Sequence, residues 1–179
     1  MRLLKSQNLF LVGPMAVGKT TIGKLLAAEL SLEFIDSDLE IERRAGADIP
    51  WIFDVEGEER FRQRETRVLE DLTQRKGILL ATGGGSVLKT ENRRILGSRG
   101  IVVYLETNVE TQVRRTEKDK KRPLLQTGDH RKVLINLNEQ RAPLYRQIAD
   151  VSVFVGDSGS KKTVNTILKK LSQAELIED

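Results

Sequence analysis

The sequence contains no cysteine, few aromatic residues and no long apolar run. The absence of cysteine among its 179 residues excludes disulfides and cysteine-ligated metal sites, and it fits a reducing compartment. Aromatic residues are only 4% of the chain, too few for a basic surface that stacks nucleic-acid bases. No stretch approaches the roughly 20 apolar residues of a membrane span. We therefore expect a soluble, cytoplasmic protein with no membrane or nucleic-acid partner.

The charged residues have a slight bias toward the positive sign, with a formal net charge of +4. Lys and Arg concentrate between Arg114 and Lys132. A basic run of this kind is often a solvated face, but it also suits nucleic acid or a small anionic substrate that carries phosphate or carboxylate. The charge balance alone does not choose between these alternatives.

Short apolar runs alternate with helical patterns along the chain. The runs are continuous, which favours strands of a parallel sheet buried on both faces. They span residues 9–12, 34–35, 78–81, 101–105 and 151–155. We expect an α/β layered fold in one domain over 1–179, with a tail from Ser172 to Asp179 that frays.

The clearest motif is the segment Gly13-Pro14-Met15-Ala16-Val17-Gly18-Lys19-Thr20, which has the spacing of a phosphate loop. It follows a predicted strand and opens a predicted helix, so backbone N–H groups and the helix dipole would converge on phosphate oxygens. Lys19 would reach the β- and γ-phosphates, and the Thr20 hydroxyl is a hard ligand for Mg²⁺. Many such loops have a further glycine where this chain has Ala16, and we expect an ordinary φ angle there.

Asp36-Ser37-Asp38 follows the apolar pair at 34–35, at the end of a strand where ligands bind in open α/β sheets. One carboxylate could hold Mg²⁺ through water, and the other could accept or orient a hydroxyl proton. The alternative is that Ser37 or Asp38 caps the helix that follows. Three glycines at 83–85 follow the next strand, where they would let a ligand approach the backbone closely.

Two isolated arginines, Arg62 and Arg141, lie at or beside apolar helical stripes, where an unpaired guanidinium is costly. One interpretation is an internal ion pair of Arg62 with Glu58, Glu59 or Glu65. The other is a clamp in which both arginines bind a substrate carboxylate. The basic segment 120–125 could in addition close over the triphosphate and place a guanidinium on the transferring phosphoryl group.

The order and spacing of these motifs closely resemble the shikimate kinase family over nearly the whole chain. The matching segments are the phosphate loop, 36–38, 57–62, 82–85, 122–125 and 141–145. The resemblance implies a nucleoside-monophosphate-kinase-like, three-layer α/β/α P-loop fold with a five-stranded parallel sheet. It also implies a substrate-binding region at about 36–64, a lid at about 114–128, and transfer of the ATP γ-phosphate to the 3-hydroxyl of shikimate, in the route to chorismate and the aromatic amino acids.

The resemblance further implies a role for individual residues. Lys19, Asp38 and Arg122 would be catalytic, with Asp38 the candidate base. One Mg²⁺ ion would be bound by Thr20 directly and by Asp36 through water. Shikimate would be bound by Asp38, Arg62, Gly83, Gly84, Gly85 and Arg141. ATP would be bound by Ala16, Val17, Gly18, Lys19, Thr20, Thr21, Arg115, Arg122 and Ser158.

Two other functions compete with this interpretation. A kinase for another polyol acid, such as gluconate, would share the phosphate loop, but a clamp of two arginines better suits a rigid ring carboxylate. A nucleic-acid-binding triphosphatase would need steeply salt-dependent binding to DNA or RNA, and only the basic charge balance supports it. We expect a monomer whose partners are ATP and shikimate.

Overall fold

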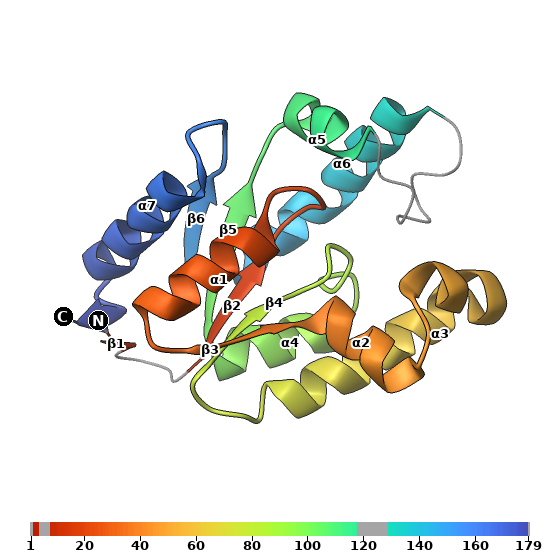
Figure 1. Cartoon of the computed structure of the whole chain (residues 1–179), viewed down its shortest axis with the longest axis horizontal. Coiled ribbons are helices and arrows are strands. Elements are labelled where there is room, and N and C mark those ends of the chain that lie inside the picture. Colours follow the sequence, from red (N-terminus) through yellow and green to blue (C-terminus); the bar gives the residue numbers. More distant parts are fainter. Residues whose placement is uncertain (1, 4–7, 118–128, 179) are drawn as a thin grey trace.

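A five-stranded parallel sheet forms the centre of the molecule (Figure 1). The computed structural model describes residues 2–3, 8–117 and 129–178. The strands run in the order β3-β4-β2-β5-β6. Their bounds are β2 (Leu9–Val12), β3 (Glu33–Asp36), β4 (Ile78–Ala81), β5 (Ile101–Glu106) and β6 (Val151–Phe154). The parallel five-stranded sheet predicted at the sequence level is confirmed.

Helices cover both faces of this sheet (Figure 1). Within the described ranges they are α1 (Lys19–Glu29), α2 (Ser37–Ala45), α3 (Ile49–Leu72), α4 (Thr90–Arg99), α5 (Val109–Thr116), α6 (His130–Ile148) and α7 (Ser160–Gln173). Alternate residues of the central strand β2 enter two separate cores, since successive side chains of a strand point to opposite faces. Leu9 and Leu11 pack with α1 and α7, whereas Phe10 and Val12 pack with residues of α2, α3, α4 and α6.

The strand order places the phosphate loop at a point where the chain changes direction across the sheet. Strand β2 lies between β4 and β5. The chain leaves β2 toward β3 on one side of the sheet, whereas it leaves the neighbouring β5 toward β6 on the other side. Ligands of open α/β sheets bind outside the carboxyl ends of the strands at such a point. The loops after β2, β3 and β4 therefore meet at one edge, although their sequences are far apart.

The C-terminal segment differs from the prediction that it frays. Helix α7 continues to Gln173, and β7 (Ile177–Glu178) then pairs with β1 (Arg2–Leu3) in a two-stranded antiparallel sheet. Leu176 and Ile177 are buried in the same core as α1 and α7. The prediction was wrong because the pairing partner lies at the opposite end of the chain.

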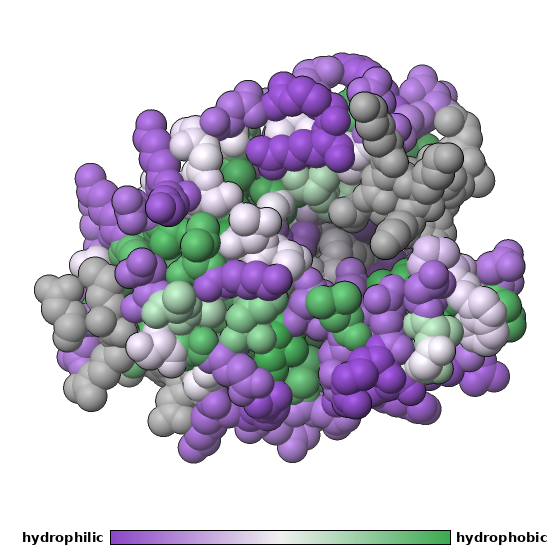
Figure 2. Space-filling model, viewed as in Figure 1, coloured by the Kyte–Doolittle hydropathy of each residue, from purple (hydrophilic) through white to green (hydrophobic). Residues whose placement is uncertain are grey.

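The surface in the view of Figure 2 is mostly hydrophilic and is hollowed beside the phosphate loop. No helix in the described part of the chain is both long and apolar enough to cross a membrane. Residues 118–128, which include most of the predicted lid and Arg122, lie outside the described residues.

Candidate active site

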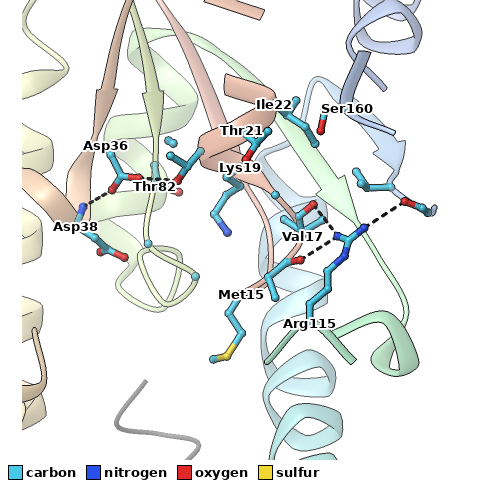
Figure 3. Close-up of a pocket in the computed structure, with 18 of the residues that line it drawn as sticks. Met15, Val17, Lys19, Thr21, Ile22, Asp36, Asp38, Thr82, Arg115 and Ser160 are labelled. Carbon is cyan, nitrogen blue, oxygen red and sulfur yellow. Dashed lines mark hydrogen bonds between the residues drawn. The ribbon is translucent and has the colours of Figure 1, made fainter. Parts of the chain in front are cut away.

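The phosphate loop connects the end of β2 with the first turn of α1 (Figure 3). Gly13 and Gly18 have φ angles of 150° and 101°, and a side chain at position 13 would collide with the carbonyl oxygen of Leu105. Ala16 has a φ of 62°, in the left-handed region, so the ordinary angle expected there was wrong. The energetic cost for a non-glycine residue is about 1–2 kcal/mol. Contacts from elsewhere in the fold must therefore stabilise this conformation.

Two basic side chains bind carbonyl groups of the loop. The Lys19 ammonium donates to the oxygens of Gly13 and Pro14, at 2.7 and 2.8 Å. Arg115 of α5 donates to the oxygens of Ala16 at 3.0 Å and Val17 at 3.4 Å. Its other terminal nitrogen donates to the oxygen of Gly156 at 3.3 Å, which ties the phosphate loop to the loop after β6 (Figure 3).

The carboxylate of Asp36, the last residue of β3, points to the phosphate loop. Asp36 accepts a hydrogen bond from the Thr20 hydroxyl at 2.8 Å, and its other oxygen accepts from the backbone N–H groups of Asp38 and Leu39. Asp36 is therefore the N-cap of α2, and neither Ser37 nor Asp38 has that role. The buried Ser37 hydroxyl instead accepts from the N–H of Gly83, at 3.1 Å.

Each of the three glycines after β4 lies against a different polar side chain. A Cβ atom added to Gly83 would lie 2.7 Å from an oxygen of Asp38 and 3.0 Å from an oxygen of Glu65. Gly84 lies against Arg141 and the backbone nitrogen of Met15. A Cβ at Gly85 would collide with the Arg62 guanidinium. Side chains at 83 and 85 would displace these groups, so a close approach requires glycine there.

Arg62 forms a buried ion pair. It donates to Glu65 at 2.9 Å and to Glu58 at 3.2 Å, so two of the three partners considered from the sequence are used. Arg62 is 7% exposed and Glu65 is 0% exposed. Burial disfavours the Arg62 cation, but the two carboxylates outweigh this effect and raise its pKa. Burial raises the pKa of Glu65 to about 7, and the neighbouring Asp38 adds to the increase while Arg62 opposes it.

Arg141 of α6 is 4% exposed, and its Nε has no hydrogen-bond partner among the described residues. Burial is the largest influence on its pKa, which lies below the ordinary value, and the nearby cation of Arg62 adds to this effect. The buried Tyr145 lies beside the guanidinium, and its hydroxyl donates to the carbonyl of Gly84. Two buried cations close together are costly, which is the arrangement expected of a site for an anion.

Two adjoining cavities of about 540 Å³ each contain these groups. The first cavity lies along the phosphate loop, Arg115 and the loop after β6 (Figure 3). The second lies between α2, α3 and α6 and includes Arg62, Arg141, Glu65 and the apolar side chain of Phe53. The residues that line both cavities are Met15, Thr20, Asp36, Asp38, Gly83 and Gly84. The site therefore has two compartments joined at the carboxyl ends of β2, β3 and β4.

The structure brings most of the predicted site residues together. The first cavity is lined by Ala16, Val17, Gly18, Lys19, Thr20, Thr21, Asp36, Asp38, Gly83, Gly84 and Arg115, and Arg62, Gly85 and Arg141 line the second. Ser158 is exposed, whereas its neighbours Asp157, Gly159 and Ser160 line the first cavity. The sequence analysis considered Glu65 only as one of three ion-pair partners for Arg62. Its complete burial beside Asp38 was not anticipated.

A phosphate loop joined to a compartment with buried arginines defines a P-loop kinase that acts on a small molecule. A family model described as shikimate kinase matches residues 15–172. Shikimate kinase of Vibrio parahaemolyticus is 58% identical over 171 residues, which cover 96% of this chain and 99% of that protein. The chain belongs to the shikimate kinase family.

Solved structures agree with this assignment. A shikimate kinase from Acinetobacter baumannii in complex with shikimate has a TM-score of 0.93 and 48% identity, with 97% of each chain covered. A gluconokinase from Sinorhizobium meliloti has a TM-score of 0.64 and 18% identity, with 98% of this chain and 96% of that chain covered. The second match shows only that the fold is shared.

Proposed function

We propose that this chain transfers the γ-phosphoryl group of ATP to the 3-hydroxyl of shikimate, giving shikimate 3-phosphate and ADP. The observation that supports this most strongly is the pair of buried guanidinium groups, Arg62 and Arg141, in a compartment that meets the phosphate loop at Asp38. Shikimate is a rigid ring that carries one carboxylate and three hydroxyls. This compartment offers guanidinium cations for the carboxylate and carboxylate oxygens for the hydroxyls.

The phosphate loop would bind the triphosphate in the first compartment. Backbone N–H groups and the N-terminus of α1 provide partial positive charge for the phosphate oxygens. Lys19 would leave its intraloop carbonyl partners to contact the β- and γ-phosphates. Arg115 and the loop after β6 would border the nucleotide base. Ser158 is the weakest of the proposed contacts, because it is not among the residues that line the cavity. Arg122 is proposed to neutralise charge on the transferring group.

The acceptor hydroxyl would lie at the junction of the two compartments. Asp38 is positioned there by the end of β3 and the first turn of α2, against Gly83. In the transfer, the bond between phosphorus and the β–γ bridging oxygen breaks and its electron pair stays with ADP, while the hydroxyl oxygen bonds to phosphorus. The Asp38 carboxylate either takes the hydroxyl proton or only orients the hydroxyl through a hydrogen bond, in which case the proton passes to an oxygen of the transferred phosphoryl group. Positioning and charge neutralisation dominate catalysis of such a loose transition state.

The residues present also fit one Mg²⁺ ion. Thr20 and Asp36 place a hydroxyl and a carboxylate oxygen 2.8 Å apart at the phosphate loop, and hard oxygen ligands are those that Mg²⁺ prefers. Thr20 would bind the ion directly and Asp36 through water. Phosphate oxygens and water would complete the shell of the ion. The ion would supply charge neutralisation at the phosphates.

A coupled assay of ADP release tests this proposal. Purified protein with MgATP should release ADP with shikimate and much less with gluconate or other sugar acids, because an analogue without the ring carboxylate leaves the buried arginines unpaired. Absence of turnover with shikimate would contradict the proposal. Light scattering on the same sample would test the expected monomer.

A further inference from the structure

Five successive carbonyl groups of the phosphate loop, from Gly13 to Val17, accept hydrogen bonds from side chains. Lys19 binds the first two and Arg115 binds the last two. The middle one, the oxygen of Met15, accepts from the side-chain amide of Gln112 at 3.0 Å. Gln112 and Arg115 are three residues apart on α5, so one face of this helix binds three consecutive carbonyls.

Gln112 is 0% exposed, and both ends of its amide are used. Its nitrogen donates to Met15, and its oxygen accepts from the side chain of Asn138 on α6, at 2.6 Å. A carbonyl can only accept, so the contact with Met15 fixes which way the amide is turned. Asn138 in turn keeps the amide in that orientation.

This contact determines the direction of one peptide in the loop. The carbonyl and the N–H of a trans peptide point in opposite directions, so a Met15 carbonyl directed toward α5 turns the N–H of Ala16 the other way. Both Met15 and Ala16 line the first cavity. Ala16 also has the left-handed φ of 62°, which a residue with a side chain rarely adopts unless neighbouring contacts enforce it.

We propose that Gln112 is a positioning residue for the nucleotide: its hydrogen bond to Met15 preorganises the Met15–Ala16 peptide for a phosphate oxygen. This inference rests on one part of the proposed function, namely that the loop binds a nucleotide. It does not depend on which molecule accepts the phosphoryl group. The competing explanation is that Gln112 is a buried amide whose only role is to join α5 to α6. The two explanations differ in what happens to nucleotide affinity.

The test measures the dissociation constant of MgADP by titration calorimetry. The Gln112→Met variant keeps the length of the side chain and removes the donor, and we expect MgADP to bind roughly 3- to 10-fold more weakly, which corresponds to one net hydrogen bond. Shikimate binding without nucleotide should stay within about twofold of the original. Unchanged MgADP affinity would overturn the proposal.

Thr116→Val is the matched control. Thr116 is buried on the same helix. Its hydroxyl donates to the backbone carbonyl of Gln112 and shares a hydrogen bond with His130, and neither bond involves the phosphate loop. We expect this variant to lose stability and to keep its MgADP affinity. If Thr116→Val loses as much MgADP affinity as Gln112→Met, any damage to α5 has the same effect. That result would overturn the specific role of Gln112.

Ala16→Gly provides a rescue that a purely structural role does not predict. Glycine adopts the left-handed conformation without steric cost, so the loop then needs less support. The loss caused by Gln112→Met should shrink to about twofold when it is measured in the Ala16→Gly background. A loss of the same size in both backgrounds would overturn the proposed link to Ala16.

A second variant covers the case in which Gln112→Met does not fold. Combining it with Asn138→Leu replaces both amides by apolar groups, which is less costly than leaving one amide buried without its partner. The double variant still lacks a donor for Met15 and should show the same loss of MgADP affinity. Retention of the original affinity would overturn the proposal. A protein that binds MgADP but does not phosphorylate shikimate would refute the proposed acceptor and leave this test unaffected.

Discussion

Replacement of Glu65 by glutamine should change how the stability of the protein depends on pH. Glu65 is fully buried, and its pKa rises from the ordinary value of 4.5 to about 7. Between these values the unfolded chain has lost the proton and the folded protein retains it, so stability falls as the pH rises through this interval. Across this interval of about 2.5 pH units, at about 1.4 kcal/mol per unit, the free energy of unfolding falls by on the order of 3 kcal/mol.

Glutamine resembles the protonated form of Glu65 and has no such titration. The pKa of about 7 already includes the attraction of Arg62 for the ionised carboxylate, which lowers the pKa. The value lies above 4.5 because the effects of burial and of Asp38 are larger than this attraction. Near pH 4.5 the two proteins should therefore have similar stability. At pH 8 we expect Glu65→Gln to be more stable than the original by about 3 kcal/mol.

Urea unfolding at a series of pH values from 4.5 to 8 measures this difference. Glu59→Gln is the matched control, because Glu59 lies on the same helix with a side chain that is 74% exposed, in a surface ion pair with Lys89. The control should have the same pH profile as the original protein, since exposed ion pairs contribute little. Parallel profiles for Glu65→Gln and the original protein would show that Glu65 does not titrate with a raised pKa in the folded protein.

Three further substitutions test the junction and the second compartment. Asp38→Asn should lower kcat by at least about 100-fold while MgATP still binds, because a general base contributes roughly 10²- to 10⁴-fold; unchanged turnover would remove Asp38 from the reaction. Arg141→Ala should raise the KM for shikimate about 10- to 100-fold, as expected for a charge-assisted hydrogen bond; an unchanged KM would remove it from the carboxylate clamp. Gly85→Ala should displace the Arg62 guanidinium and raise the same KM with little effect on the MgATP dissociation constant; equal effects on both constants would indicate general misfolding.

The parts of the fold that the sequence predicted are those encoded by local patterns. Continuous apolar runs such as 101–105 are buried strands because both faces of a parallel sheet are covered. The phosphate loop was recognised because its spacing and its position between strand and helix are themselves local features. The loops after β2, β3 and β4 meet because their strands are parallel neighbours, so most of the predicted site residues converge.

The parts that the sequence did not predict depend on partners far along the chain. The left-handed Ala16 is supported by Arg115, 99 residues away, and its neighbour Met15 by Gln112, 97 residues away. The C-terminal strand β7 pairs with β1 at the other terminus. Glu65 has the sequence pattern of an ordinary charged helical residue, because its burial depends on Asp38 of α2 and on Gly83 after β4. No local propensity encodes such contacts, because packing between distant segments creates them.

Phosphorus NMR of the reaction product is the most direct test of phosphoryl transfer to shikimate, since it separates this transfer from simple hydrolysis of ATP. With MgATP and shikimate, we expect a new phosphate ester on the 3-hydroxyl of shikimate, formed in equal amount to ADP and nearly absent with Asp38→Asn. Formation of ADP and inorganic phosphate without the ester, or an ester on a different acceptor only, would contradict it.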